Sequence, residues 1–408
     1  MNEARHPPRG TFLGVYDIET TGDLRQTAEF IAREESAGSW SGGGPPTERY
    51  ARSVAWVHTV QETGPGKGSS AIAFPTANLP ERGSLFPAIW LYLTAGPLFE
   101  RPFAEVVRLA DVVLPEEILA TFRGPRFGVE GTRALAGKAR EALLFGAIVK
   151  PGAGLGPEEV AERCAAAARG GIDLIKDDEK MNNPAYCPLV ERVRAVSRAL
   201  REVENDTGRR VIYCAHLSGR PDEMVAAARE AVRAGATGVM VNVFASGLAS
   251  LQMLREDEGI AVPIYVHSGG RSLLSQRPAY GIDTRVFAEF VRLLGGDYLD
   301  LYAQGGYLRT DPPAEAKGLA EVLRAPWARV APVLPACSGG LTARTLAANY
   351  AAFGRDILPM AGSAIFSHPL GAGSGVKALH QAAESYFGGI PLEDYGRRHP
   401  ELEAALRA

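Results

Sequence analysis

The sequence predicts an α/β protein, in which a C-terminal (β/α)8 TIM barrel follows a smaller N-terminal α+β domain of the ferredoxin-like type. Two observations support this prediction. Beyond residue 145, eight short apolar runs recur, each followed by a helical segment, which is the pattern of parallel strand–helix units. The length of 408 residues also suits a barrel of about 250 residues with one small domain beside it. We expect the N-terminal domain at residues 1–125, the barrel at 126–375 and a helical tail at 376–408.

The N-terminal domain is predicted from short apolar strands and one capped helix. Phe12–Glu19 is expected to be a strand, and Asp23 is placed to cap a helix that runs to about Glu35. The further expected elements are strands at 53–60, 69–75 and 106–114 and an apolar helix at 85–94. Strands and helices therefore mix within one small segment, which is typical of an α+β domain.

Eight apolar runs define the expected barrel strands. They are Gly146–Lys150, Ile172–Asp178, Val211–His216, Val239–Phe244, Pro263–His267, Tyr298–Ala303, Val333–Ser338 and Ile357–Ala361. Two of the intervening helices, Pro157–Arg169 and Pro221–Ala234, begin at a proline and are followed by a glycine. Consecutive right-handed crossovers of this kind close best into a barrel. A doubly wound open sheet is the alternative, but no GxGxxG run follows the first strand.

Composition and charge exclude several classes of function. The net charge of -3 leaves no basic surface for nucleic acid, and the chain has no apolar run of about 18 residues that would span a bilayer. The first ten residues are polar and lack the apolar core of a secretory leader. The four cysteines show no CxxC spacing, which is typical of reduced thiols. We therefore expect a cytoplasmic protein with no nucleic-acid or membrane partner.

One short run, Ile172–Glu179, ends a buried strand in one lysine and three consecutive carboxylates. Such charge at the end of an apolar strand is costly unless it faces a cation or a polar cleft. Because side chains alternate along a strand, Lys176 and Asp178 point to the same side, where Glu179 can join them. Oxygen ligands grouped in this way suit a hard cation such as Mg²⁺. A solvated acidic turn is the alternative.

Lysine is rare in this chain, which gives weight to two lysines at predicted strand ends, Lys150 and Lys176. Seven lysines occur among the 44 basic residues, so arginine supplies the remaining 37. A lysine retained at a special position indicates chemistry that arginine does not perform, such as losing a proton or forming an adduct on nitrogen. GC-rich coding would give the same bias.

Polar or ionisable side chains end nearly every predicted barrel strand. Because the carboxyl ends of the strands form the active face of such barrels, we expect a functional rim there. Its candidate members are Lys150, Lys176, Asp178, Glu179, His216, Asn242, His267, Asp300, Gln304, Ser338, Gly339, Gly340, Ala361, Gly362 and Ser363. The glycines of the last two strand ends allow backbone N–H groups to approach an oxyanion, which is the usual phosphate position of the fold. Tight strand–helix turns are the alternative there.

These motifs resemble the large-subunit family of ribulose-bisphosphate carboxylase (RuBisCO) over nearly the whole chain. The run from Gly171 to Glu179 is similar to the family's GGxDxxKDDE, which is a specific signal. Ile148–Pro151 is similar to IxKP, and Ser338-Gly339-Gly340 is similar to SGG. The resemblance supports the predicted order of a small α+β domain followed by a barrel.

Carried onto this chain, the resemblance implies a metal site and two further catalytic groups. It implies that CO₂ carbamylates Lys176, and that the carbamate binds Mg²⁺ together with Asp178 and Glu179. It also implies that Lys150 handles protons at the substrate and that His267 is the catalytic histidine after the fifth strand. Both Mg²⁺ and CO₂ are therefore expected cofactors.

The segment from Glu34 to Trp40 resembles the family's ExxxG[TS]W motif. In the family this segment reaches the active site of the partner subunit. The resemblance therefore implies a homodimer or a higher oligomer of dimers, in which Glu34, Ser39 and Trp40 complete the phosphate site of the neighbouring barrel.

The chain also departs from the carboxylases of the family. Gly152 follows Lys150-Pro151 where the family has a lysine. Ser268 replaces an arginine of the family, and Asp300 replaces a histidine. The metal-site asparagine is replaced near Gly96-Pro97, and residues 304–310 offer no lysine. The resemblance is therefore to a RuBisCO-like protein that does not fix CO₂. Because Ser268 and Asp300 both fall on one of the family's two phosphate sites, we infer a substrate with one phosphate, unless Arg271 supplies the second site.

The implied chemistry is Mg²⁺-dependent enolate formation on a phosphorylated keto sugar or keto sugar acid. We favour decarboxylation or carbon–carbon cleavage of a 3-oxo sugar-acid phosphate, as in apionate breakdown, which would make the protein a lyase. An enolase or isomerase of a 1-phosphorylated diketo sugar, as in methionine salvage, is the alternative, although Gly96-Pro97 stands where those enolases have their lysine base. A non-catalytic sugar-phosphate binder is the third hypothesis. His216, Asn242, Asp300 and Gln304 are expected to contact the substrate, with barrel-mouth packing as an equal alternative for His216 and Asn242.

Overall fold

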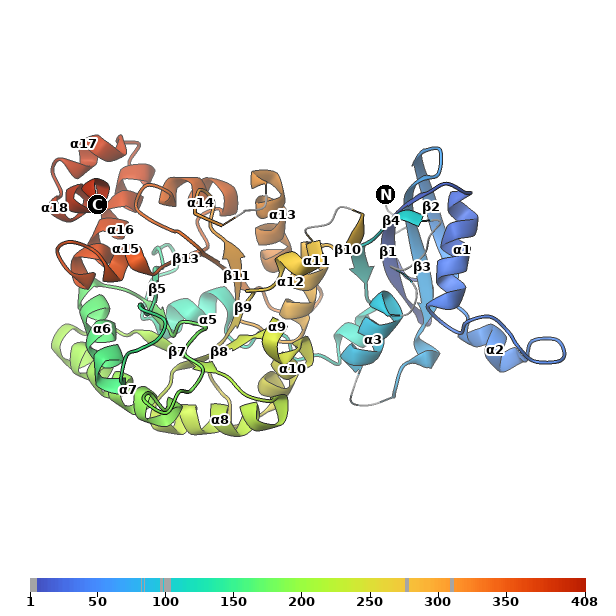
Figure 1. Cartoon of the computed structure of the whole chain (residues 1–408), viewed down its shortest axis with the longest axis horizontal. Helices are drawn as coiled ribbons and strands as arrows, with labels where there is room; N and C mark the ends of the chain where they lie inside the picture. The colour runs from blue at the N-terminus through green and yellow to red at the C-terminus, as the bar shows by residue number, and fades with distance from the viewer. Residues whose placement is uncertain are drawn as a thin grey trace. The chain divides into compact units, whose positions relative to one another are not determined.

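The computed structural model describes residues 6–81, 83, 85–95, 98, 104–275, 279–308 and 312–408 (Figure 1). The chain forms two compact units. The first contains residues 1–122 and 270–290, and the second contains residues 123–269 and 291–408. Each unit has its own sheet, and each is described by itself.

A five-stranded sheet in the order β10-β4-β1-β3-β2 forms the first unit. Its strands are β1 (Thr11–Thr20), β2 (Trp56–Gly64), β3 (Lys67–Pro75), β4 (Ala104–Val113) and β10 (Tyr280–Ile282). Its helices are α1 (Leu24–Glu34), α2 (Glu48–Ser53), α3 (Leu85–Thr94), α4 (Glu116–Leu119) and α11 (Ser272–Ser275), with a 3₁₀ turn at Thr76–Asn78. The order β4-β1-β3-β2 is that of a ferredoxin-like sheet, which confirms the predicted α+β architecture.

Local signals explain most elements of this unit. The Asp23 carboxylate accepts the backbone N–H of Gln26 at 2.8 Å, so the predicted cap does begin α1. The strand expected at 53–60 begins only at Trp56, because Thr47 caps the short helix α2, which continues through Ser53. The Thr47 hydroxyl accepts the Tyr50 backbone N–H at 3.2 Å, and this capped helix outweighed the apolar pattern at this point.

Strand β10 lies far along the chain from its neighbours in this sheet. It pairs in parallel with β4, with Gly281 opposite Arg108. The Arg108 guanidinium also contacts the Asp283 carboxylate at 2.9 Å. The segment between the fifth and sixth barrel strands thus makes an excursion to the N-terminal sheet, which nothing in the apolar pattern had indicated.

The second unit is a closed barrel of parallel strands in the order β11-β12-β13-β5-β6-β7-β8-β9. The strands are β5 (Gly146–Ile148), β6 (Leu174–Lys176), β7 (Ile212–Leu217), β8 (Gly238–Asn242), β9 (Ile264–His267), β11 (Tyr298–Tyr302), β12 (Leu334–Ser338) and β13 (Leu358–Ala361). The helices are α5 (Gly128–Leu135), α6 (Pro157–Gly170), α7 (Leu189–Thr207), α8 (Pro221–Ala234), α9 (Val243–Ser246), α10 (Leu248–Glu256), the end of α12 (Thr284–Leu293), α13 (Pro313–Arg324), α14 (Leu346–Phe353), α15 (Ser363–Phe366), α16 (Ala372–Phe387), α17 (Leu392–Gly396) and α18 (Pro400–Arg407). All eight predicted runs supply barrel strands, which confirms the TIM barrel and excludes the open sheet.

The barrel interior is filled by apolar side chains from many strands. Its fully buried members include Leu174, Ile212, Met240, Tyr265, Tyr298, Leu334 and Leu358. This packing leaves the polar strand ends as the open face of the barrel. In the described part of the chain, no helix has both the length and the apolar character needed to cross a membrane.

Candidate active site

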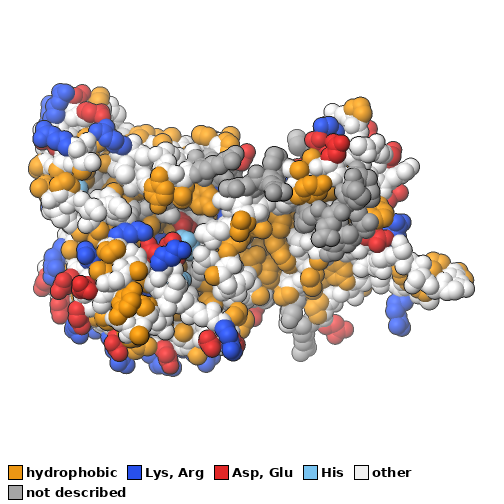
Figure 2. All heavy atoms as spheres, in the orientation of Figure 1, with side chains coloured by type: hydrophobic (Ala, Val, Ile, Leu, Met, Phe, Trp, Pro, Cys, Tyr) orange, Lys and Arg blue, Asp and Glu red, His pale blue; other side chains and the backbone are white. Residues whose placement is uncertain are grey.

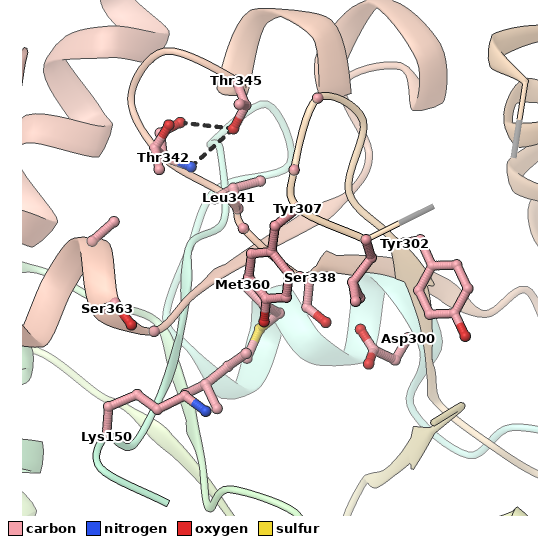
Figure 3. Close-up of a pocket in the computed structure, with 18 of the residues that line it drawn as sticks. Lys150, Asp300, Tyr302, Tyr307, Ser338, Leu341, Thr342, Thr345, Met360 and Ser363 are labelled. Atoms are coloured by element: carbon pink, nitrogen blue, oxygen red, sulfur yellow. Dashed lines mark hydrogen bonds between the residues drawn. The ribbon is translucent and has the colours of Figure 1, made fainter. Parts of the chain in front are cut away.

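The carboxyl ends of the barrel strands surround one cavity of about 740 Å³. Its lining includes the predicted residues Lys150, Lys176, Glu179, His267, Asp300, Ser338, Gly339, Gly340, Gly362 and Ser363. Figure 3 shows Lys150 and Asp300 entering the cavity from opposite sides, with Ser338 between them and Ser363 at its edge. In Figure 2, histidine side chains are visible between acidic and basic ones on the barrel unit.

Lys176 ends β6 at the floor of this cavity and is completely buried. Its Nζ lies 3.3 Å from the Asp177 backbone carbonyl and 5.4 Å from the centroid of the Tyr265 ring. It makes no ion pair with any described residue. A buried ammonium with so few partners is an expensive arrangement, which indicates that the amine serves a purpose other than packing.

The three carboxylates after Lys176 have different surroundings. Asp178 is buried and pairs with the ammonium of Lys150, and its other oxygen accepts the Lys180 backbone N–H at 2.9 Å. Glu179 lines the cavity. Neither Asp177 nor Asp178 is among its lining residues, so the alternation expected for these positions does not continue past Lys176, where β6 ends.

Asp177 is instead the centre of a buried network. Its carboxylate lies 3.1 Å from Nε of Arg192, and both side chains are completely buried. It also accepts the Tyr213 hydroxyl at 2.7 Å and the His216 backbone N–H at 2.9 Å. This network ties the end of β6 to helix α7 and strand β7, so Asp177 holds the end of β6 in place.

The Lys150–Asp178 pair sets the charge of both residues. Although burial alone would lower it, the hydrogen bond and charge of Asp178 raise the pKa of Lys150. Burial opposes the ionised form of Asp178, yet Lys150 lowers the pKa of this carboxyl.

His267 ends β9 beside two carboxylates. Its Nε2 lies 3.6 Å from a Glu179 oxygen and 3.6 Å from an Asp300 oxygen. Burial, reinforced by the Lys176 charge, lowers the pKa of His267 to about 4, so the ring is neutral at physiological pH. Nδ1 contacts the side-chain amide of Asn242 at 3.1 Å.

Asp300 and Ser268 occupy the positions where the family resemblance expects a phosphate-binding histidine and arginine. Asp300 accepts the hydroxyl of Tyr265 at 3.2 Å and is nearly completely buried. Ser268 is also buried, and its hydroxyl donates to the Asp300 backbone carbonyl. A buried carboxylate at this edge of the cavity would repel a phosphate.

Several predicted residues lie outside the main cavity. His216 and Asn242 line a second cavity of about 590 Å³, which shares Glu179 with the first. Ala361 is buried within β13 and is not among the lining residues, whereas the following residues, Gly362 and Ser363, line the first cavity. Gln304 is buried and lines neither of these two cavities, and its backbone N–H and carbonyl are hydrogen-bonded by the side chain of Asn349.

The N-terminal candidates belong to the first unit. The Ser39 hydroxyl donates to Glu34 at 2.9 Å. The Trp40 ring lies 5.0 Å from that of Tyr50, and its Nε1 donates to the Gly44 carbonyl at 2.8 Å. Gly96 and Pro97, where the resemblance expects a metal-site asparagine or a lysine base, lie outside the described residues.

The sequence analysis missed part of the rim. The cavity is also lined by Tyr302, Tyr307, Leu308, Leu341, Thr342, Arg344 and Thr345. Arg344 follows the Gly339-Gly340 pair by four residues, so a basic residue shortly after a glycine pair was the signal available in the sequence. The Arg344 guanidinium pairs with Glu393 at 3.1 Å and donates to the Leu406 carbonyl at 2.7 Å, so the case for an anion at this end rests on the backbone N–H groups of the glycines.

Gly340 tests the proposed anion end directly. Its φ is +89°, and a Cβ there would lie 2.7 Å from the Tyr307 backbone nitrogen. Because this clash would shift the turn that presents the N–H groups to an anion, we expect Gly340→Ala to weaken the binding of inorganic phosphate about tenfold in calorimetry, which corresponds to about 1.4 kcal/mol. Gly318→Ala is the matched control, since its Cβ would meet open space on α13. Equal phosphate affinity in the two variants would contradict this placement.

Comparison with known proteins agrees with this fold. Residues 128–408 match the family model for the catalytic domain of the ribulose bisphosphate carboxylase large chain, and residues 2–118 match the model for its N-terminal domain. A 3-oxo-isoapionate-4-phosphate decarboxylase from Rhizobium etli is 32% identical over 96% of this chain and 97% of its own length.

Two solved structures are similar in both fold and sequence. An octameric RuBisCO from Pyrococcus horikoshii has a TM-score of 0.89 and 30% identity, with 100% of this chain and 95% of that chain covered. A RuBisCO-like protein from Burkholderia fungorum has a TM-score of 0.85 and 31% identity, with 98% and 100% covered. Fold and site thus define a barrel protein whose polar cavity lies at the strand ends. The chain belongs to the RuBisCO large-chain family.

Proposed function

We propose that this protein is a Mg²⁺-dependent RuBisCO-like lyase that decarboxylates a 3-oxo sugar acid carrying one phosphate. The observation that carries the proposal is Lys176, a completely buried lysine without an ion-pair partner among the described residues, in a cavity shared with Glu179, His267 and Asp300. The chain is as similar to a ribulose bisphosphate carboxylase from Pyrococcus abyssi, at 32% identity, as to the Rhizobium etli decarboxylase, so the preference for decarboxylation rests on Gly152, Ser268 and Asp300 at positions where the carboxylases have lysine, arginine and histidine.

The residues present fit a hard cation in one particular way. Among the described residues, no group of three His, Cys, Asp or Glu side chains is placed to hold a metal. Two carboxylates, Asp178 and Glu179, flank the lysine, so a third oxygen ligand must come from elsewhere. Carbamylation of Lys176 by CO₂ would replace its buried positive charge with an oxygen donor at the required place. When bound, Mg²⁺ supplies Lewis-acid polarisation of the substrate carbonyl.

The chain's own residues would divide the remaining work. Lys150 holds a proton at the cavity through its pair with Asp178, and metal binding by Asp178 requires Lys150 to turn toward the substrate. Loss of CO₂ leaves an electron pair on the substrate carbon and keto oxygen, and Lys150 can return a proton to that carbon. The Nε2 of His267 faces the same space.

The two ends of the cavity differ in charge, which supports a substrate with one phosphate. Gly339, Gly340 and Gly362 line one end of the cavity, where their backbone N–H groups would bind an anion. Asp300 gives the opposite edge a buried negative charge, where a second phosphate would be repelled. A monophosphate with a hydroxylated part toward Asp300 and His267 satisfies both ends.

We further propose that the protein works as a homodimer or an assembly of dimers. The Glu34–Trp40 segment would complete the phosphate end of the neighbouring barrel, as the motif resemblance implies. The similar Pyrococcus horikoshii RuBisCO is octameric, which supports assembly. A monomeric mass in light scattering at micromolar concentration would contradict it.

The reaction is tested with a panel of phosphorylated keto sugars and 3-oxo sugar-acid phosphates, in the presence of Mg²⁺ and bicarbonate. We expect Mg²⁺-dependent CO₂ release from a 3-oxo sugar-acid monophosphate, followed by deuterium incorporation from the solvent. Deuterium exchange without CO₂ release would favour the enolase or isomerase alternative. Tight binding without either reaction would favour the non-catalytic binder.

A further inference from the structure

Two histidines, His216 and His267, lie at the barrel mouth. Each contacts groups whose role as hydrogen-bond donor or acceptor is known. His216 ends in the second cavity and His267 in the first, and Glu179 lines both. A neutral imidazole carries its proton on only one nitrogen, and the partner of one nitrogen decides the role of the other. The two rings can therefore be assigned from their neighbours.

The assignment of His267 depends on the orientation of Asn242. The Asn242 Oδ1 accepts the backbone N–H groups of Phe244 and Ala245, at 2.9 and 3.2 Å, where it caps helix α9. Its Nδ2 must then face the other way, and it donates to the Gly269 carbonyl at 3.2 Å. A flipped amide would place Oδ1 against that carbonyl and Nδ2 against two N–H groups, so the cap excludes it.

Two N–H donors therefore converge on Nδ1 of His267. Asn242 Nδ2 lies 3.1 Å from it, and the Gly269 backbone N–H lies 3.2 Å from it. A nitrogen that accepts both must be unprotonated, which places the proton on Nε2. Nε2 is the atom that faces the carboxylates of Glu179 and Asp300, each at 3.6 Å, so a donor there is electrostatically favoured.

His216 has the opposite surroundings. Its Nδ1 lies 3.3 Å from the backbone carbonyl of Met181, which only accepts hydrogen bonds. Nδ1 therefore carries the proton, and Nε2 is left as the lone-pair nitrogen. The His216 backbone N–H donates to the Asp177 carboxylate. This contact holds the His216 backbone in place, so that its ring stays beside the Met181 carbonyl.

We propose that the site holds two neutral histidines in opposite tautomers, with His267 as a hydrogen-bond donor, His216 as an acceptor, and Asn242 as the positioning residue that fixes His267. The two cavities that share Glu179 therefore differ in hydrogen-bonding character, with a donor in the first and an acceptor in the second. An oxygen with lone pairs, such as a keto or carboxylate oxygen, is recognised by His267 in the first cavity. A hydroxyl group is recognised by His216 in the second cavity.

This arrangement deepens the proposed function, on which its substrate consequence rests. The second cavity adds polar groups from Asn182, Asn183, Ser218 and Ser246 beside His216. It contains one lysine and no arginine, so it suits an uncharged polyhydroxy end better than a phosphate. The substrate class is therefore a monophosphate whose far end carries at least one hydroxyl donor near His216.

The tautomers are measured by ¹⁵N solid-state NMR of full-length protein labelled in its seven histidines, with His267→Gln and His216→Gln to assign the signals. We expect an unprotonated Nδ1 for His267 and a protonated Nδ1 for His216 in the wild type. Asn242→Asp keeps an N-cap oxygen for α9 but presents a carboxylate oxygen to His267, so Nδ1 should become protonated. Asn205→Asp, the same change on exposed α7, should leave both signals unchanged.

The wild-type spectrum alone can overturn the inference, even if Asn242→Asp does not fold. The same tautomer in both rings, or a protonated Nδ1 in wild-type His267, would contradict it. So would an unprotonated Nδ1 in folded Asn242→Asp. These signals do not depend on turnover, so failure of the proposed reaction would leave them unaltered. For a substrate that turns over, His216→Gln should raise KM for hydroxylated compounds more than for analogues lacking that hydroxyl.

Discussion

Lys176→Arg is expected to abolish Mg²⁺-dependent turnover, with a loss of kcat/KM on the order of 10³-fold or more. Arginine keeps the positive charge but does not form a carbamate, so it cannot supply the third oxygen ligand beside Asp178 and Glu179. The measurement is the rate of CO₂ release at saturating Mg²⁺ and bicarbonate. Lys317→Arg, the same change on exposed helix α13, should retain wild-type activity.

Lys176 is completely buried and arginine is larger, so Lys176→Arg could also disturb the packing. A second variant separates the loss of chemistry from the change in packing. Lys176→Met has similar length and removes the buried charge. We expect it to be equally inactive and to melt at a higher temperature than the wild type when Mg²⁺ and CO₂ are absent. Losing a catalytic group costs at least roughly a factor of ten in rate. Turnover above about one-tenth of the wild-type rate in either variant would therefore contradict the proposed role of Lys176 as a carbamylated metal ligand.

Asp177→Asn is expected to destabilise the protein by about 3–5 kcal/mol, although the residue lies between two proposed metal-site residues. The change leaves Arg192 as a buried charge without its counter-ion and weakens the contacts to Tyr213 and the His216 backbone. Urea unfolding, followed by circular dichroism, measures the loss.

The neighbouring substitution Asp178→Asn is the matched control for Asp177→Asn. It should lower stability much less, because the partner Lys150 remains partly exposed, but it should weaken Mg²⁺ binding strongly. The double variant Asp177→Asn/Arg192→Met should recover part of the lost stability, since it removes both buried charges together. Equal stability losses for Asp177→Asn and Asp178→Asn would show that the two carboxylates do not have the separate roles proposed here.

The fold was largely predictable because barrel strands are short, apolar and regularly spaced. All eight runs supplied strands, and the prolines and glycines marked the helices α6 and α8 closely. The excursion through β10 was not predictable, because Tyr280–Ile282 is too short to show a pattern and its partner β4 lies in another part of the chain. Pairing partners depend on tertiary structure, which a single strand does not encode.

The site was predicted in part, and the failures have physical reasons. Strand ends located Lys150, Lys176 and His267 correctly at the cavity. The role of Asn242 was not predictable from its strand-end position, because it depends on where β8 stops and α9 begins. Gln304 and Ala361 line neither of the two cavities, since a position at a strand end does not say whether a side chain points into the mouth or packs behind it.

The central claim is that Lys176 becomes a carbamate that binds Mg²⁺ with Asp178 and Glu179. The direct measurement is ¹³C NMR of the protein equilibrated with ¹³C-labelled bicarbonate and Mg²⁺. We predict a carbamate resonance that strengthens as Mg²⁺ is added and is missing in Lys176→Arg, while Lys317→Arg retains it. A wild-type spectrum without a carbamate signal at saturating Mg²⁺ and bicarbonate, or an unchanged signal in Lys176→Arg, would contradict this account.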